Sequence, residues 1–477
     1  MSFAVMRQLF TPLSSTLQRM QQSVGVAPPT QAMLDEEDHD SCPLLRHLPM
    51  LKQKIAYRAL GDRFPTPIHE ASVQSAAGFR CHFYVKREDL SSGLYGGNKV
   101  RTLQFQLAVL EARLSCGEPH VLPLTVIGTY GSNQNVATVV HAASRIPALL
   151  PSINVAMTEP EVPDLDSALN VLSILSFTRA KPLFNLLPTL PPVLRATFLG
   201  KGTVIMLGGN TPSGCMGQVS ALLELAMQIE AGEAPDPDRI YLAIGSSCTV
   251  SGLIIGVALS RHLGLKAFAS GEFKICGVII HHLLAGLQRN FDFHRKWQDT
   301  PLSIAQTIRA TCGTMASLGA PDLTEKALKV LADEVEINDD KGLCGKYGGH
   351  SELSRKAAGL YDTSGKTYSM ESGVEVPQKP IWLCGHFVAK PFASMIDAIE
   401  ASSLRGEQLK CILWQTKSAV QPRGNADEWE KATRMPHALK TWMTEGKAES
   451  SLRPGSIDPF SGTAADYRSG MTAVNLD

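Results

Sequence analysis

The sequence predicts an α/β protein with parallel sheets, and three observations lead to this fold class. Short apolar runs of the buried-strand type recur at residues 125–128, 153–157, 203–207, 239–244, 275–280 and 410–414. Amphipathic stretches lie among them. In 100–110 and in 219–229, apolar residues recur at steps of three and four, as on one face of a helix. Glycine-rich turns follow several runs, and strands alternating with helices in this way form parallel sheets.

Length and composition predict a globular protein of two or three domains, at a typical ~100–200 residues per domain. The chain has 477 residues, of which 44% are hydrophobic and 19% are charged. Lys+Arg and Asp+Glu both number 45, so the net charge is zero, which argues against a nucleic-acid partner. No apolar run approaches the roughly 20 residues that cross a bilayer, so we expect no membrane partner. Ten cysteines without a Cys-x-x-Cys pair predict reduced intracellular thiols.

The two ends of the chain differ from the middle. Residues 1–34 contain no Asp or Glu and several Ser and Thr, which is typical of an organellar presequence or a disordered extension. We expect this extension to end near residue 45, after an acidic cluster at 35–38. Residues 426–477 are expected to form a C-terminal helix and a solvated tail rich in Gly, Ser, Pro and charges. The expected location is cytoplasmic, with mitochondrial as the alternative.

The first turn that carries chemistry runs from Lys86-Arg-Glu-Asp-Leu90 through Gly96-Gly97-Asn98-Lys99 into a helix. Two adjacent glycines permit close backbone approach just before the helix starts. The helix dipole and neighbouring basic residues would favour the neutral, nucleophilic amine of Lys99. A neutral amine is what Schiff-base chemistry with an aldehyde cofactor requires. Taken alone, however, a lysine after Gly-Gly is an ordinary solvated helix-start residue.

The second turn covers residues 128–135 and leads from a strand into a helix. Its polar residues are Ser132, Asn133 and Gln134. They could cap the helix or bind a ligand carboxylate, and taken alone the helix cap is the better explanation.

The third turn follows the strand that ends at Ile244 and opens the next helix. A strand, a turn of small residues and a helix N-terminus form an anion site suited to one phosphate. Hydroxyl groups in the turn would add donors. The alternative is an ordinary strand-to-helix turn with a Ser/Thr cap. The turn consists of Gly245, Ser246, Ser247, Cys248 and Thr249.

Together and in this order, the three turns resemble the fold-type-II pyridoxal-phosphate (PLP) enzymes, most closely the branch of 1-aminocyclopropane-1-carboxylate deaminase and D-cysteine desulfhydrase. The resemblance covers residues 64–260 well and extends more loosely to about 420. It implies the tryptophan synthase β-like fold, with two open, mostly parallel sheets flanked by helices. Residues 46–425 would form the catalytic unit, with a smaller subdomain at about 98–200 inserted in a larger one. The resemblance also implies a homodimer and a small amino-acid substrate.

The resemblance assigns roles by position. Lys99 matches the lysine that binds the cofactor aldehyde and moves the α-proton of the substrate. Asn133 matches the residue that bonds the ring hydroxyl of PLP. Ser132 and Gln134 match positions near the substrate carboxylate, and residues 245–249 match the phosphate loop.

The sequence also departs from the family pattern. The family has a late segment with an active-site tyrosine followed by Thr or Glu near the pyridine nitrogen. The best match here is 386–392, where Phe387 replaces the tyrosine and Val388 replaces the polar residue. Tyr361 or Tyr368 could serve instead. In the phosphate loop, Ser247 and Cys248 replace glycines, which would crowd the backbone near the phosphate.

Other motifs carry no function. Ser364-Gly-Lys-Thr367 lacks the first glycine of a phosphate-binding P-loop, and His281-His282 lacks ligands at metal spacing, so no metal is expected. Three functions remain. The first is a PLP-dependent enzyme that removes the α-proton of a small amino acid, with elimination or deamination. The second is a PLP-binding protein that has lost the catalytic tyrosine, and the third is a different α/β enzyme with another phosphate ligand.

Overall fold

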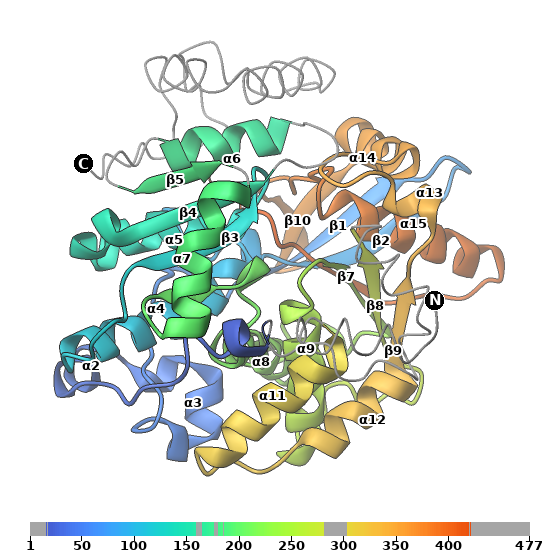
Figure 1. The fold of residues 1–477 in the computed structure, drawn as a ribbon. Helices are drawn as coiled ribbons and strands as arrows, with labels where there is room; N and C mark the ends of the chain where they lie inside the picture. The colour runs from blue at the N-terminus through green and yellow to red at the C-terminus, as the bar shows by residue number, and fades with distance from the viewer. Residues whose placement is uncertain are drawn as a thin grey trace, which may run out of the picture.

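The computed structural model describes residue 16, residues 18–158, 165–175, 180–184, 186–280 and 303–418, and residue 420. These residues form two β-sheets with helices packed around them, as Figure 1 shows. The predicted α/β fold with two sheets flanked by helices is therefore confirmed.

The larger sheet has eight strands in the order β11-β10-β1-β2-β12-β7-β8-β9. The strands from β2 to β9 in this order run parallel, whereas β1, β10 and β11 pair antiparallel. The bounds are β1 (Ile68–Gln74), β2 (Arg80–Lys86), β7 (Arg239–Ile244), β8 (Lys274–Ile279), β9 (Val335–Asn338), β10 (Lys366–Glu371), β11 (Val374–Pro377) and β12 (Cys411–Trp414).

The smaller sheet has four parallel strands in the order β5-β4-β3-β6. They are β3 (Leu124–Thr129), β4 (Ile153–Thr158), β5 (Lys181–Phe184) and β6 (Thr203–Ile205). The apolar run expected at 203–207 ends as a strand at Ile205, because the chain enters a 3-10 helix at Leu207–Gly209. Gly208 and Gly209 have φ values of 60° and 72°, which a β-strand does not contain.

Helices cover both faces of the larger sheet. Side chains along β7 alternate: Ile240, Leu242 and Ile244 join one hydrophobic core, whereas Tyr241 joins a second core on the other face. The first core contains α4, α8, α9, α11 and α12, and the second contains α14 and α15. The longer helices are α4 (Asn98–Ser115), α5 (Asn133–Arg145), α6 (Leu165–Leu175), α7 (Leu186–Leu199), α8 (Pro212–Glu230), α9 (Cys248–His262), α11 (Ile304–Ser317), α12 (Thr324–Glu334), α14 (Glu352–Ser364) and α15 (Ala389–Leu404).

Part of the expected N-terminal extension is folded. Residues Gln31–Glu36 form α2 and Pro43–His47 form α3. Met33, Leu44 and Leu45 from these short helices are buried in the first core. This segment therefore packs on the body of the protein, because its apolar side chains contribute to the same core as α8.

Several expectations fall outside the described residues, namely the C-terminal helix and tail at 426–477 and the pair His281-His282. All ten cysteines are described, and they are thiols rather than disulfides. Within the described ranges, no helix combines the length and apolarity needed to cross a bilayer.

Candidate functional site

Lys99 lies in the first turn of α4, directly after two glycines. Gly97 caps this helix with φ of 97°, in the left-handed region that favours glycine. A Cβ atom at Gly97 would lie 2.5 Å from the carbonyl oxygen of Thr416, so the segment after β12 packs against the helix start only because no side chain is present. The close backbone approach expected at this turn is thus found in the structure.

The amine of Lys99 points toward the turn at 207–210. Nζ donates a hydrogen bond of 3.0 Å to the carbonyl oxygen of Gly208. Burial lowers the pKa of this lysine, because the charged form loses its hydration. The neighbouring basic residues do not cause the shift, since Lys86 and Arg87 are each paired with a buried carboxylate. The expected direction therefore holds, but desolvation is its cause.

Residues 245–249 form a strand-to-helix turn, since β7 ends at Ile244 and α9 begins at Cys248. Ser247 has φ of 67°, a left-handed conformation that serine adopts less readily than glycine. The thiol of Cys248 points into the interior, where Sγ donates to the carbonyl oxygen of Gly209 at 3.6 Å. The helix N-terminus that the sequence predicted as an anion site is therefore the start of α9.

One hydrogen bond joins this turn to the start of α4, and Gly208 lies close to side chains from both segments. The side chain of Asn98 donates a hydrogen bond of 2.7 Å to Oγ1 of Thr249. A Cβ atom at Gly208 would lie 2.3 Å from Oγ of Ser246 and 3.5 Å from Nζ of Lys99, so both side chains face this glycine. The structure therefore brings Lys99 together with two predicted phosphate-loop residues from a distant part of the chain.

The start of α5 contributes the second predicted turn. Ser132 is the N-cap of this helix, and its Oγ accepts a hydrogen bond of 3.3 Å from the backbone nitrogen of Asn135. Gln134 donates to Oγ1 of Thr138 at 3.2 Å. Its buried Oε1 has no hydrogen-bond partner within the described ranges, and a Cβ at Gly209 would lie 2.8 Å from it. Gln134 therefore faces the same glycine turn as Lys99, while Ser132 acts as a helix cap.

Asn133 lies in a cluster of buried polar side chains. Its Oδ1 accepts hydrogen bonds from the hydroxyl of Tyr95 at 3.0 Å, from Nδ2 of Asn170 at 3.0 Å and from Nζ of Lys417 at 3.4 Å. Sequence reasoning missed these three residues. Tyr95 could have been found, because it stands inside the glycine-rich segment 93–97. Asn170 and Lys417 carry no local signal, and only the fold brings them to Asn133.

The segment aligned with the family's tyrosine motif reaches the second turn through His386. A Cβ at Gly131 would lie 2.5 Å from Nδ1 of this histidine. The ring of Phe387 stacks on His386 at 4.2 Å and 18°. Tyr347 packs edge-on against His386 at 4.5 Å, and its hydroxyl lies 3.1 Å from Oγ1 of Thr129. Tyr347 is thus a hydroxyl group beside this turn that the sequence did not single out. Burial raises its pKa to about 12.

Of the two tyrosines considered as substitutes, Tyr361 lies on α14 and Tyr368 lies on an antiparallel strand of the larger sheet. The hydroxyl of Tyr361 accepts a hydrogen bond of 3.1 Å from the backbone nitrogen of Ile381 and contacts Oγ1 of Thr367. Tyr368 lies on β10 opposite Glu70 of β1. Tyr347, rather than Tyr361 or Tyr368, is therefore the tyrosine whose hydroxyl group lies beside the second turn.

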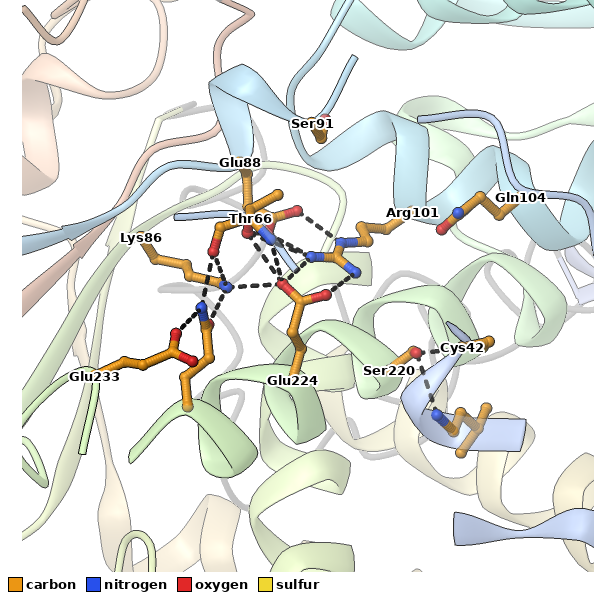
Figure 2. Close-up of polar contacts among 12 residues, drawn as sticks. Cys42, Thr66, Lys86, Glu88, Ser91, Arg101, Gln104, Ser220, Glu224 and Glu233 are labelled. Carbon is orange, nitrogen blue, oxygen red and sulfur yellow. Dashed lines mark hydrogen bonds and ion pairs between the residues drawn. The ribbon is translucent and has the colours of Figure 1, made fainter. Parts of the chain in front are cut away.

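A buried ion cluster lies beneath the start of α4 (Figure 2). Arg101 binds both oxygens of Glu88 and both oxygens of Glu224, at 2.6–2.9 Å. Lys86 donates to Glu224 at 2.7 Å and to the carbonyl oxygen of Thr66 at 2.8 Å. The cluster therefore pairs two cations with two carboxylates, and it ties α4 to α8 and to the end of β2. The Lys86–Leu90 motif thus holds in place the helix that carries Lys99.

No cluster of three or more His, Cys, Asp or Glu side chains suited to a metal ion occurs in the part of the chain that the structure describes.

Comparison with protein-family models finds no match. Among curated proteins, the chain is 34% identical over 188 residues to nocardicin C-9' epimerase of Nocardia uniformis subsp. tsuyamanensis. The match covers 37% of this chain and 53% of the epimerase, so the chain spans about half the length of this curated relative.

Three solved structures are similar to this chain. An ACC deaminase homologue has a TM-score of 0.49 at 18% identity, over 78% of this chain and 94% of that one. Serine racemase from Dictyostelium discoideum has a TM-score of 0.43 at 13% identity, over 79% and 97%. A threonine deaminase has a TM-score of 0.39 at 17% identity, over 70% and 87%.

Proposed function

We propose that this chain binds pyridoxal 5'-phosphate and uses Lys99 to move the α-proton of a small amino acid. The observation that carries the proposal is the position of the Lys99 amine. Its pKa is lowered by burial, and it faces Gly208 together with Ser246 of the turn at 245–249. An amine with a lowered pKa can attack an aldehyde, and a helix N-terminus two residues away from Ser246 suits a phosphate.

The other side chains around this amine fit the same ligand. The hydroxyls of Ser246 and Thr249 and the backbone at the start of α9 would hold the phosphate. Asn133 would bond the ring hydroxyl. Ser132 and Gln134 would lie near the substrate carboxylate, and the buried Oε1 of Gln134 is an acceptor that lacks a hydrogen-bond partner within the described ranges.

Bound PLP would supply an electron sink for the carbanion that forms when the α-proton leaves. Lys99 would hold and return that proton through Nζ. We propose an outcome of elimination or deamination, of the D-cysteine desulfhydrase type. The match at 34% identity to a protein named as an epimerase supports proton movement, because inversion of a C–H centre requires a base.

The second candidate is a PLP-binding protein that is not a deaminase. Phe387 supports this alternative, because its ring stacks on His386 and carries no hydroxyl group to act as acid, base or nucleophile. Val388 next to it is fully buried and apolar, so it offers the pyridine nitrogen no polar partner.

The two candidates separate in one experiment on the purified protein. PLP is added and the visible absorption band is recorded; the protein is then incubated in D2O with D- and L-cysteine, serine and 1-aminocyclopropane-1-carboxylate. The proposed enzyme exchanges the α-proton of at least one α-H amino acid, seen by NMR, or releases keto acid. A visible band without exchange or product would identify the non-deaminase. Absence of the band in the wild-type protein would overturn PLP binding itself.

Replacing Phe387 by tyrosine is expected to raise product formation. Tyrosine keeps the ring that stacks on His386, the histidine next to Gly131 of the second turn, and adds one hydroxyl group. General acid–base groups contribute about 10²–10⁴-fold to rates, so we expect at least a tenfold rise in the turnover of D-cysteine. Steady-state pyruvate release measures it. Phe387→Leu serves as the control, since it adds no hydroxyl. Equal turnover in Phe387→Tyr and wild type would show that another group, such as Tyr347, already fills the role.

The homodimer and the cytoplasmic location expected from the sequence stay predictions. Light scattering of the purified protein would test the first, and cell fractionation would test the second.

A further inference from the structure

Lys417 lies three residues after β12, and its side chain is 1% exposed. Its backbone forms an antiparallel bridge with Gly97, which places it beside the turn that starts α4. The ammonium group points into the polar cluster around Asn133. It donates to Oδ1 of Asn170 at 3.0 Å and lies 3.4 Å from both Oδ1 of Asn133 and the hydroxyl of Tyr95. It also lies 5.6 Å from the centre of the Tyr95 ring.

These contacts fix the orientation of the Asn133 amide. Three donors, from Tyr95, Asn170 and Lys417, converge on its Oδ1. A carboxamide is planar and carries its oxygen and its NH2 group on opposite edges. With the oxygen bonded to this cluster, the NH2 group is the edge that Asn133 offers to a ligand. A donor of this kind binds an oxygen acceptor, and it binds an anionic oxygen most strongly.

The charge of Lys417 also favours the binding of an anionic oxygen at Asn133. A cation buried away from water interacts with a nearby anion much more strongly than a surface cation does. An anionic ligand oxygen bound to the NH2 edge of Asn133 would be separated from the buried ammonium group of Lys417 only by the Asn133 amide.

We propose that Lys417 is a positioning residue of the ligand site, which orients Asn133 and supplies the positive charge that favours an anionic oxygen on the bound ring. The proposal rests on the function proposed above, in which Asn133 bonds the ring hydroxyl of PLP. Lys99 and Lys417 then have separate tasks: the first amine reacts, and the second holds a charge.

The test measures binding rather than turnover. PLP is titrated into the ligand-free wild-type protein and into Lys417→Met, and the dissociation constant is read from the visible band. Loss of one hydrogen-bonded charge is expected to weaken PLP binding by about 10- to 100-fold. Lys417→Arg should retain most of the affinity. Lys390→Met is the matched control: this lysine is also fully buried, but its ammonium lies near the carbonyl oxygens of Ile280 and Lys346.

A second ligand separates a charge effect from a general loss of structure. The wild-type protein should bind PLP at least about tenfold more tightly than its 3-O-methyl analogue, which has no anionic ring oxygen, and Lys417→Met should remove this preference. In Lys417→Met, the pH midpoint of the absorbance change of bound PLP should also rise by about one unit, because a cation favours the anionic form.

Equal affinities of the wild type for PLP and the analogue would overturn the proposal, and this result needs no variant to fold. Equal weakening by Lys417→Met and Lys390→Met would overturn it as well. If Lys417→Met is insoluble, Lys417→Gln, which keeps a donor without the charge, is measured in its place. A wild-type protein that binds no PLP would refute the proposed function, whereas one that binds PLP without preferring the ring oxygen would refute only the role of Lys417.

Discussion

Replacing Lys99 by alanine is expected to abolish covalent attachment of PLP. The wild-type protein, mixed with PLP and reduced with borohydride, should gain the mass of one reduced cofactor on the peptide that contains Lys99. The variant should gain none, because no other amine faces Gly208 and the turn at 245–249 in the contacts described. Intact-protein mass spectrometry and peptide mapping measure the result, and the visible band should disappear with it.

The experiment distinguishes Lys99 from three other lysines whose side chains are buried. Lys86, Lys390 and Lys417 are each at most 1% exposed, and each is hydrogen-bonded to protein oxygens. Attack on an aldehyde requires a neutral amine with its lone pair directed at the carbonyl. Lys99→Arg is the control, since it keeps a cation at the site without a reactive amine and should also trap nothing. Attachment to the Lys417 peptide in wild type or in Lys99→Ala would show that the roles of the two lysines are exchanged.

Replacing Arg101 by methionine is expected to destabilise the protein by about 3–5 kcal/mol, the usual effect of breaking a buried ion pair. Arg101 contacts Glu88 and Glu224 through its guanidinium group, and all three side chains are at most 4% exposed. Without it, two buried carboxylates share the single charge of Lys86. The shift in the midpoint of urea unfolding measures the loss. Lys329→Met is the control, because the pair Lys329–Asp333 is exposed and solvent screening leaves such a pair with little effect on stability.

The same cluster predicts how stability depends on pH. Burial alone would raise the pKa of the Glu224 carboxyl, but Arg101 and Lys86 together lower it to about 2. The pKa in the folded state therefore lies below the ordinary value of 4.5. The ionised carboxylate stabilises the fold above about pH 4.5, and this stabilisation is lost as the pH falls toward 2. Urea unfolding at pH 7, 4.5 and 3 should show the loss in wild type and a smaller loss in Arg101→Met. An equal decrease in both proteins would show that other carboxylates govern acid unfolding.

The sequence by itself determined six of the parallel strands, namely β3, β4, β6, β7, β8 and β12. The parallel strands β5 and β9 were not predicted, because each has only four residues and includes an exposed position. Buried parallel strands are apolar on both faces, so the run at 239–244 predicted β7 to the residue. The strands β1 and β2 were missed, because they form an antiparallel hairpin with exposed positions such as Gln74 and Arg80, and their pattern mixes polar and apolar residues. The position of Lys99 at a helix start was also readable from local sequence, because a lysine after Gly-Gly is a feature of a few consecutive residues.

Only the tertiary structure decided which side chains surround that lysine and what shifts its pKa. Local sequence suggested that neighbouring basic residues would lower the pKa of Lys99, yet the fold pairs those residues with carboxylates and leaves burial as the cause. Lys417 lies 284 residues from Asn133 in the chain, and the segment after β12 brings it there through its bridge with Gly97. Hydrogen bonding and desolvation depend on distances of a few ångströms between segments far apart in sequence, and the chain sets those distances only when both sheets and the helices between them have packed.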